Sequence, residues 1–365
     1  MSEFKLQIEV NNHPYDRDML YIAIGLKGGF ITKDYLVDDE VFSGSYAFYN
    51  VLFNYLRIAG MSGLHYDVLR AASIISFSVK GKDLITTLNE SLSTLFNYEY
   101  NEEIFEIAKL TTREGFANRY KDGAFRAKYK AFEFSDLNKR FLLKSLISDI
   151  ESIDFKLFRS IVTTLLSPAN VCVYICGDTN QIDWNEIQNG IPEVDCKPIT
   201  VAGYNFDPYL KQDAHIINMA REDANIIVET IDFLNPDVTN FTKLLIVELL
   251  AERLPIRDSE VWVDSLDASI IMVSEQLETY KSYIQVFTED DFDKAKNSLL
   301  TKYVVLIEKH PDIFSIKAVN MMLVGVYIDQ YLSFLDGCSK DMFSEICAKA
   351  DLKITEAQIA LRKEK

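Results

Sequence analysis

The second half of this 365-residue chain repeats the first half in outline. Each half closes with a polar residue, a helix that contains Phe, a break and a strand. The two closing units are IDFKLFRSIVTTLLSPANVCVYICGD at residues 153–178 and SKDMFSEICAKADLKITEAQIALRK at residues 339–363. A pattern repeated at this scale is typical of a repeated structural unit. We therefore predict two similar α+β domains in tandem, each built from packed strands and helices.

Hydrophobic periodicity predicts alternating strands and helices in both halves. In the first half, the predicted strands are 20–28, 73–79 and 171–176, and the predicted helices are 44–59, 83–96, 102–122 and one or two within 136–166. In the second half, the predicted strands are 224–232, 261–263, 269–274, 283–287 and 353–362, and the predicted helices are 240–254, 290–308, 312–334 and 340–350. Gly and Pro interrupt the stretch between the halves. The predicted domains are therefore residues 1–185 and 213–365, joined by a linker at 186–212.

Composition and charge exclude some functions. Hydrophobic residues make up 48% of the chain and charged residues 25%, as in a globular protein with a substantial core. The net charge of −17 argues against nucleic-acid binding, because a phosphate backbone requires a basic surface. The acidity favours either solubility or a basic peptide partner, and the sequence leaves both open.

The chain shows no sign of a membrane span or an oxidising compartment. The longest apolar runs, such as 319–328, are too short to cross a bilayer, and the N-terminal MSEFKLQIEV lacks the pattern of a signal peptide. The five cysteines are expected to be reduced thiols of a cytoplasmic protein. Cys172 and Cys176 are expected in the core rather than on a metal, and Gly28-Gly29 in a turn rather than a phosphate-binding loop.

Four segments carry a resemblance to a known family. They are GSYAFYNVLF at 44–53, the helical segment 105–122, PANVCVYICGD at 168–178 and LLAERLPIRDSEVWVDS at 249–265. In these segments the chain resembles the M16 peptidases, the insulinase and mitochondrial-processing-peptidase group. It is most similar to the short M16B type, in which two chains pair around a cavity that holds a peptide as an added strand. The resemblance implies an α+β fold of two tandem, structurally similar domains, each a mixed, mostly antiparallel sheet covered by helices.

The zinc-binding motif of that family is missing. Where the family carries His-x-x-Glu-His, this chain has Tyr46 and Asn50 in place of the two histidines and Tyr49 in place of the catalytic glutamate. Glu114 falls near the place of the family's third zinc ligand. A catalytic zinc needs three protein ligands around an open position, and one carboxylate does not supply them. We therefore predict no catalytic residue, no bound metal and no other cofactor.

The second half carries a different candidate site. In M16 peptidases an Arg and a Tyr in this region reach towards the substrate, and in M16B pairs the chain without zinc can supply them. Arg257 matches the Arg and Trp262 is the nearest aromatic residue to the Tyr. Trp can stack and donate one N–H, but it lacks the phenolic hydroxyl. The alternative is that Arg257 lies in an exposed turn while Trp262 packs in a sheet.

The leading hypothesis is a non-catalytic subunit of a heterodimeric M16B zinc peptidase. Its partners would be a peptide substrate and a catalytic chain that carries His-x-x-Glu-His and zinc. The nearest guess at a pathway is the maturation of bacteriocins, as an AlbE-like subunit. One alternative is a stand-alone peptide-binding or scaffold protein with an M16-like shell. Another is a hydrolase with an unrecognised site, although no pattern of nucleophile and base supports it.

Overall fold

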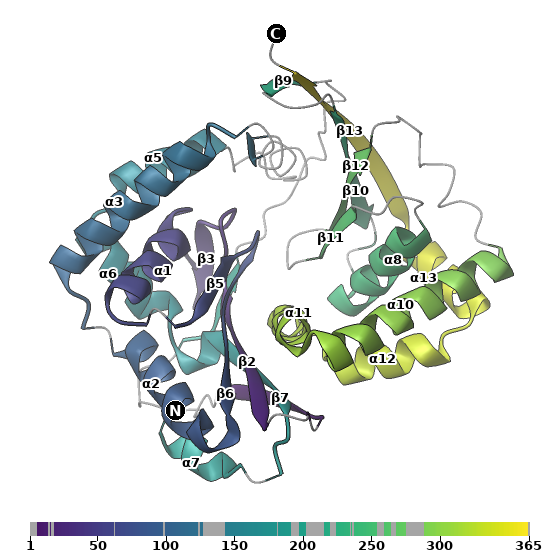
Figure 1. The fold of residues 1–365 in the computed structure, drawn as a ribbon. Coiled ribbons are helices and arrows are strands. Elements are labelled where there is room, and N and C mark those ends of the chain that lie inside the picture. Colours follow the sequence, from purple (N-terminus) through teal and green to yellow (C-terminus); the bar gives the residue numbers. More distant parts are fainter. Residues whose placement is uncertain are drawn as a thin grey trace. The chain divides into compact units, whose positions relative to one another are not determined.

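The computed structural model describes residues 6–13, 15, 18–61, 63–97, 99–122, 125–126, 143–180, 182–190, 197–201, 215–219, 224–233, 235, 237–253, 259–263, 268–274 and 288–363. The chain folds into two compact units (Figure 1). The first comprises Met1–Gly115, Lys144–Ala202 and Leu306–Leu323, and the second Phe116–Leu143, Gly203–Val305 and Val324–Lys365. Leu306–Leu323, a segment of the second half of the sequence, thus belongs to the first unit. Two consecutive stretches of sequence do not describe this arrangement.

The first unit is built on a five-stranded mixed sheet. In spatial order its strands are β1 (Gln7–Asn12), β7 (Val171–Gly177), β2 (Met19–Lys27), β6 (Ala72–Lys80) and β5 (His65–Val68). Only the β1–β7 pair is parallel. The helices of this unit are α1 (Phe48–Ile58), α2 (Leu84–Phe96), α3 (Glu102–Arg119, whose last turn passes into the second unit), α5 (Leu143–Ser152), α6 (Phe155–Leu165), α7 (Trp184–Asn189) and α11 (Pro311–Leu323). Short 3₁₀ turns, Gly81–Asp83 and Pro168–Asn170, precede α2 and β7.

The second unit has a sheet of the same design. Its strands, in spatial order, are β11 (Ser259–Val263), β12 (Ala268–Ser274), β10 (Ala224–Phe233), β13 (Leu352–Lys363) and β9 (His215–Met219). Again one outer pair, β9–β13, is parallel and the other pairs are antiparallel. The helices are α8 (Asn240–Arg253), α10 (Glu289–Lys309), α12 (Ile328–Gly337) and α13 (Lys340–Ala350).

The two sheets match strand for strand. Strands β1, β2, β5, β6 and β7 correspond to β9, β10, β11, β12 and β13, and α1 corresponds to α8, which follows the equivalent strand. Both closing units have the predicted polar cap: Asp154 accepts from the Leu157 N–H at 2.7 Å, and Ser339 accepts from the Met342 N–H at 3.3 Å. The predicted fold class is confirmed.

Helix α11 explains why its segment belongs to the first unit. It contacts β2, β6 and β7, and Figure 1 shows it on the opposite side of that sheet from α1. Gly25 on β2 permits the close approach, since a Cβ there would lie 2.9 Å from Val319 Cγ2. Ser315 Oγ also lies 3.3 Å from the Tyr21 carbonyl oxygen. Strand β2 is buried on both faces as a result.

An aromatic cluster packs α1 against α3 and α6. The Phe158 ring centroid lies 5.6 Å from that of Phe48, 6.0 Å from Tyr55 and 5.0 Å from Phe105. These side chains are at most 5% exposed. Burying an aromatic side chain of this size contributes about 2 kcal/mol relative to exposure. Helix α1, which carries Tyr49 and Asn50, is therefore fixed in the core of the first unit.

The structure differs from the predicted elements in several places; β1, β5, β9 and α7 were not predicted. The single helix expected at 312–334 is two helices, because the chain turns at Gly325, whose φ of +76° does not continue a helix. A three-stranded sheet of β4 (Glu40–Ser43), β3 (Asp34–Val37) and β8 (Ile199–Val201) was not expected, and β8 lies inside the predicted linker. The strand predicted at 283–287 lies outside the described residues.

Within the described part of the chain, no single helix combines the length and the apolar composition needed to cross a membrane. The bent pair α11 and α12 would do so by length and composition alone.

Candidate functional site

Tyr46, Tyr49 and Asn50, which the sequence resemblance sets at the positions of the zinc motif, span the entry to α1. The helix begins at Phe48, so Tyr46 lies in the turn before it. Ser45 organises this turn: its Oγ accepts from the Ala47 N–H at 3.1 Å and its carbonyl from the Phe48 N–H at 3.2 Å. The Tyr46 N–H donates to Asp149 Oδ2 on α5 at 2.9 Å. Tyr46 thus makes a backbone contact with α5 just before the start of α1.

Tyr49, which the sequence resemblance sets at the position of the family's catalytic glutamate, is 2% exposed. Its hydroxyl donates to the Lys27 carbonyl oxygen at 2.5 Å, which ties α1 to the end of β2. Burial raises the pKa of this phenol well above its usual value, and the nearby Tyr35 raises it further. Tyr49 therefore stays protonated at neutral pH and serves as a buried hydrogen-bond donor. A general base must instead accept a proton.

Asn50 is the residue that the sequence resemblance sets at the second histidine. Its backbone carbonyl oxygen accepts from Thr112 Oγ1 of α3 at 3.3 Å, and Thr112 Oγ1 accepts from Asn54 Nδ2 at 2.8 Å. Asn50 Nδ2 is buried and has no hydrogen-bond partner among the described residues. An amide nitrogen carries no lone pair for a metal, so this atom does not replace the histidine.

Glu114 does not join the motif. Its side chain is exposed, whereas Phe105, Ala108 and Thr112 form the buried face of α3. Two residues along a helix correspond to a rotation of about 200°, so Glu114 and Thr112 point in different directions. Thr112 is the α3 residue that meets Asn50. No sequence signal distinguishes this threonine from its neighbour Thr111, so reasoning from the sequence missed it.

The glycine pair beside the motif is a packing site. Gly28 has a φ of +106°, and a Cβ there would lie 2.4 Å from the Tyr35 hydroxyl and 3.0 Å from the Tyr49 ring. A Cβ on Gly29 would lie 2.1 Å from the Leu69 carbonyl oxygen. The Gly28 N–H donates to the Ala71 carbonyl at 3.0 Å, which extends the β2–β6 pairing, and the chain turns directly afterwards, where the Thr32 N–H donates to the Gly29 carbonyl at 3.2 Å. The pair is thus a closely packed strand end that leads into a turn.

A zinc ion does not fit these residues. The Tyr49 hydroxyl is committed to a backbone carbonyl, Asn50 offers no nitrogen lone pair, and Glu114 is exposed on α3. Across the described residues, no three His, Cys, Asp or Glu side chains are grouped so that they could hold a metal ion. Cys172 and Cys176 are buried on β7 as free thiols, and burial raises the pKa of Cys172 to about 12.

The edge strand β5 lies next to α1. Phe53 of α1 packs against Tyr66 of β5 with ring centroids 5.0 Å apart, and the Arg57 guanidinium lies 4.9 Å from the same ring. The Leu69 N–H donates to the Ala72 carbonyl at 2.8 Å, which sets the alternation of hydrogen bonds along the β5–β6 pair. By that alternation, Tyr66 and Val68 present their backbone N–H and C=O groups to the open side of β5.

The candidate residues of the second half are only partly placed. Trp262 lies on β11, opposite Ser269 of β12. β11 is the edge strand that corresponds to β5 in the duplicated design. Arg257 lies outside the described residues. The predicted pairing of Arg257 and Trp262 as a substrate contact stays a prediction.

Comparison with known proteins finds similarity in structure rather than in sequence. No family model and no curated protein matches the chain. An Alicyclobacillus acidocaldarius protein described as an M16-like peptidase aligns with a TM-score of 0.73 and 11% identity, over 98% of this chain and 96% of that one. A protease from Helicobacter pylori aligns at 0.64 and 11%, over 98% of both chains.

A third similar structure is an inactive domain of an M16 peptidase from Pseudomonas fluorescens. It aligns with a TM-score of 0.62 and 9% identity, over 100% of this chain and 97% of that one. Identities this low establish the fold and not the activity. The chain therefore has the M16-peptidase-like fold over its whole length, a fold that it shares both with a protease and with an inactive domain.

Proposed function

We propose that the chain is the non-catalytic subunit of a heterodimeric M16B zinc peptidase. In this proposal a separate chain supplies His-x-x-Glu-His and zinc, while this chain completes the cavity and holds part of the peptide. Holding the substrate in a fixed geometry lowers the entropy lost at the reaction step. The observation that supports the proposal is that Tyr49, the residue that the sequence resemblance sets at the catalytic base, is a buried hydrogen-bond donor.

The open edge of β5 supports the peptide-binding part of the proposal. β5 pairs only with β6 among the described strands, and it contacts the motif helix through Tyr66. An extended peptide can add to such an edge through its main chain. The backbone groups of Tyr66 and Val68 are the ones that would receive it. Trp262, on the equivalent edge β11, and Arg257 are proposed as substrate contacts on the strength of the sequence resemblance.

The proposal extends to a pathway and a compartment. The sequence resemblance favours peptides that are matured into bacteriocins as the substrate class. The described cysteines, Cys172, Cys176, Cys338 and Cys347, are free thiols, which suits a reducing, cytoplasmic setting.

Co-purification tests the subunit assignment. The isolated chain is mixed with an M16B chain of similar length that carries His-x-x-Glu-His and comes from the same gene cluster. Light scattering after size exclusion should show a one-to-one complex, and peptide cleavage should need both chains. Two separate monomer peaks and cleavage by the catalytic chain alone would contradict the assignment.

A stand-alone peptide-binding protein is the second candidate, because the open edge of β5 requires no catalytic partner. It predicts that the chain binds extended peptides by itself and forms no complex with any intact M16B chain. The same mixing experiment distinguishes the two candidates.

A further inference from the structure

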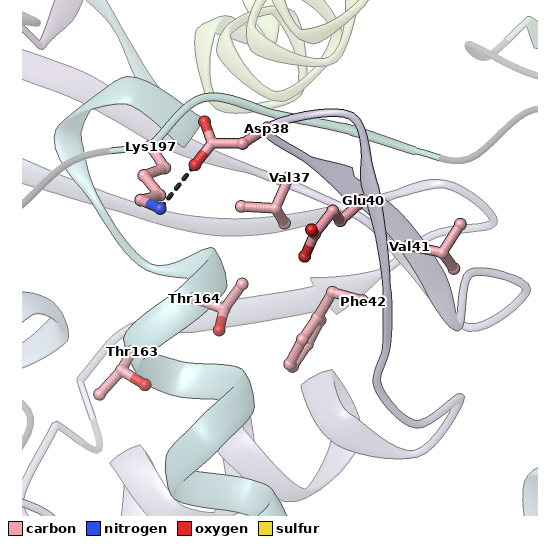
Figure 2. Close-up of a pocket in the computed structure, with 8 residues that line it drawn as sticks. All are labelled: Val37, Asp38, Glu40, Val41, Phe42, Thr163, Thr164 and Lys197. Carbon is pink, nitrogen blue, oxygen red and sulfur yellow. Dashed lines mark hydrogen bonds and ion pairs between the residues drawn. The ribbon is translucent and has the colours of Figure 1, made fainter.

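A pocket lies in the first unit, between the β3–β4 hairpin and the C-terminal turn of α6 (Figure 2). Its volume is about 730 Å³. Its lining consists of Val37, Asp38, Glu40, Val41, Phe42, Thr163, Thr164 and Lys197. This volume is in the range of sites that bind small molecules or several side chains of a peptide. None of the lining residues belongs to the motif around α1 or to β5.

The hairpin presents an open strand edge at this pocket. β4 is an outer strand of its sheet and pairs with β3 alone among the described strands. The Gly44 N–H donates to the Lys33 carbonyl at 2.7 Å, so the alternation of an antiparallel pair directs the backbone groups of Phe42 and Glu40 towards β3. The N–H and C=O groups of Val41 and Ser43 consequently point to the open side.

The side chains of the hairpin divide between its two faces. Figure 2 shows Val37, Glu40 and Phe42 on the side facing Thr164 of α6, and Val41 pointing away. Val41 is 62% exposed, which is high for a large aliphatic residue. The pocket therefore combines an apolar floor, formed by Val37 and Phe42, with a carboxylate at Glu40.

The charges around the pocket favour a cation. Asp38 is paired with Lys197 at 2.5 Å, and both side chains are more than half exposed. Glu40 has no ion pair or hydrogen bond with the other residues that the structure describes, and Lys197, the basic residue of the lining, is paired with Asp38. The last turn of α6, which holds Thr163 and Thr164, contains no basic residue. The partial negative charge at a helix C-terminus adds to that of Glu40.

We propose that this pocket binds an extended, basic peptide segment. The segment adds to the open edge of β4 through Val41 and Ser43, as in strand addition. It places a Lys or Arg side chain beside Glu40, with the methylene stem along Phe42 and Val37. The site is separate from β5, and binding there does not depend on a catalytic partner, so it stands or falls independently of the proposed function.

Binding of defined peptides to the isolated full chain tests the proposal. The probes are three labelled heptapeptides of alternating Thr and Val that differ only in a central Arg, Gln or Glu, measured by fluorescence anisotropy. The Arg peptide should bind about threefold to fivefold more tightly than the Gln peptide, the effect of one solvent-exposed ion pair. Glu40→Gln should abolish this preference.

Two further variants separate charge from backbone pairing. Asp39→Asn removes a carboxylate from the same turn outside the pocket, and Asn tolerates the left-handed φ of +64° at this position, so the Arg preference should persist. Val41→Pro removes only an outward N–H and should weaken all three peptides. Thermal melts confirm that each variant is folded.

Several results would overturn the proposal. These are equal affinity of the wild-type chain for the Arg and Gln peptides, a preference that survives Glu40→Gln, and peptide binding that Val41→Pro leaves unchanged. A wild-type dimer that Val41→Pro converts to a monomer would also overturn it, because a second copy of the chain would then occupy the edge.

Discussion

Tyr49 shows at the scale of one residue how this chain differs from the peptidases whose fold it shares. Its ring is buried, and its hydroxyl donates to the Lys27 carbonyl oxygen. A glutamate in this place would bury a carboxylate against a backbone carbonyl, an arrangement without a donor and costly in free energy. Tyr49 therefore provides a hydrogen bond that anchors α1, which a carboxylate in its place would not provide.

The phenylalanine variant measures that contact. Tyr49→Phe should lower the free energy of unfolding by about 1–2 kcal/mol, since it leaves the buried Lys27 carbonyl without its donor. Urea denaturation checks the value. Tyr120→Phe is the control, because the Tyr120 ring is 43% exposed and the loss of an exposed hydroxyl should change stability by less than about 0.5 kcal/mol. Equal effects of the two variants would show that the Tyr49 hydroxyl does not stabilise the fold.

Buried tyrosines also determine how stability depends on pH. In the second unit, Glu248 is 4% exposed and accepts from Tyr303 at 2.9 Å and from Tyr331 at 2.7 Å. Burial raises the pKa of both phenols well above the usual value, and the adjacent Glu248 carboxylate raises it further. In the unfolded chain these phenols ionise near pH ~10. Above that pH the folded state holds more protons than the unfolded state, so stability is lost as the pH rises.

The pH prediction is tested by comparing the wild-type chain with Tyr331→Phe. The free energy of unfolding of the wild type should fall steadily once the pH exceeds about 10, and the fall should be shallower in the variant. Urea denaturation at pH 8, 9.5, 10.5 and 11 gives both slopes. Parallel slopes would mean that Tyr331 does not retain its proton in the folded state.

At the scale of elements, the contact between α11 and β2 holds a segment of the second half in the first unit. Gly25 is the residue that allows it. Strand β2 lies in the middle of the sheet and is apolar on both faces, so both faces must be covered. Helix α11 covers the face opposite α1. The fold thus requires a small residue at this place.

Gly25→Ala tests this requirement. The added Cβ would lie 2.9 Å from Val319 Cγ2 and 3.1 Å from Leu323 Cδ1, so the variant should lose about 1–3 kcal/mol through overpacking. Gly63→Ala is the control, because no atom lies within 4 Å of a Cβ there. Val319→Ala should recover part of the loss when combined with Gly25→Ala. An unchanged melting temperature of Gly25→Ala would contradict the account of α11.

The open edge of β5 makes a prediction for the assembled complex. Val68→Pro removes an N–H that faces away from β6, so it should leave the melting temperature nearly unchanged while weakening peptide cleavage. Steady-state kinetics of the complex should show a raised KM. Leu69→Pro is the contrasting variant, since it removes the bond to the Ala72 carbonyl and should destabilise the fold. Wild-type kinetics in Val68→Pro would show that the peptide does not pair with β5.

The sequence predicts the long elements and misses the short ones for physical reasons. Helices and central strands carry a periodic apolar pattern, which is why the two-unit design could be predicted from the closing segments. The β3–β4 hairpin has strands of only four residues each and turns at Asp38 and Asp39, both with positive φ, without the Asn-Gly or Asp-Gly signal of such turns. The break at Gly325 was hidden because apolar residues continue on both sides of it.

The sequence shows the residue types at the candidate positions but not the contacts that they make. Tyr46, Tyr49 and Asn50 are read directly from it. The contact of Asn50 with Thr112 depends on the rotation of α3 about its axis, which a sequence alone fixes only to within a residue or two. The exposed position of Glu114 follows from the same rotation.

At the scale of the whole molecule, two units of the same strand order share one chain. In the first unit α1 is packed against buried aromatic residues. In the second unit the equivalent helix, α8, carries Glu248, which is bound by two tyrosines. Both units thus share the strand order of the M16-peptidase-like fold. The side chains named here on α1 and α8 serve packing and hydrogen bonding.

The most direct test of this account is the zinc content of the isolated chain. The chain is purified without chelators, dialysed against a small excess of zinc and then against metal-free buffer, and analysed by mass spectrometry for zinc per mole of protein. The account predicts far less than one zinc per chain, and about one zinc per complex once a chain with His-x-x-Glu-His is added. One tightly bound zinc per isolated chain would contradict it.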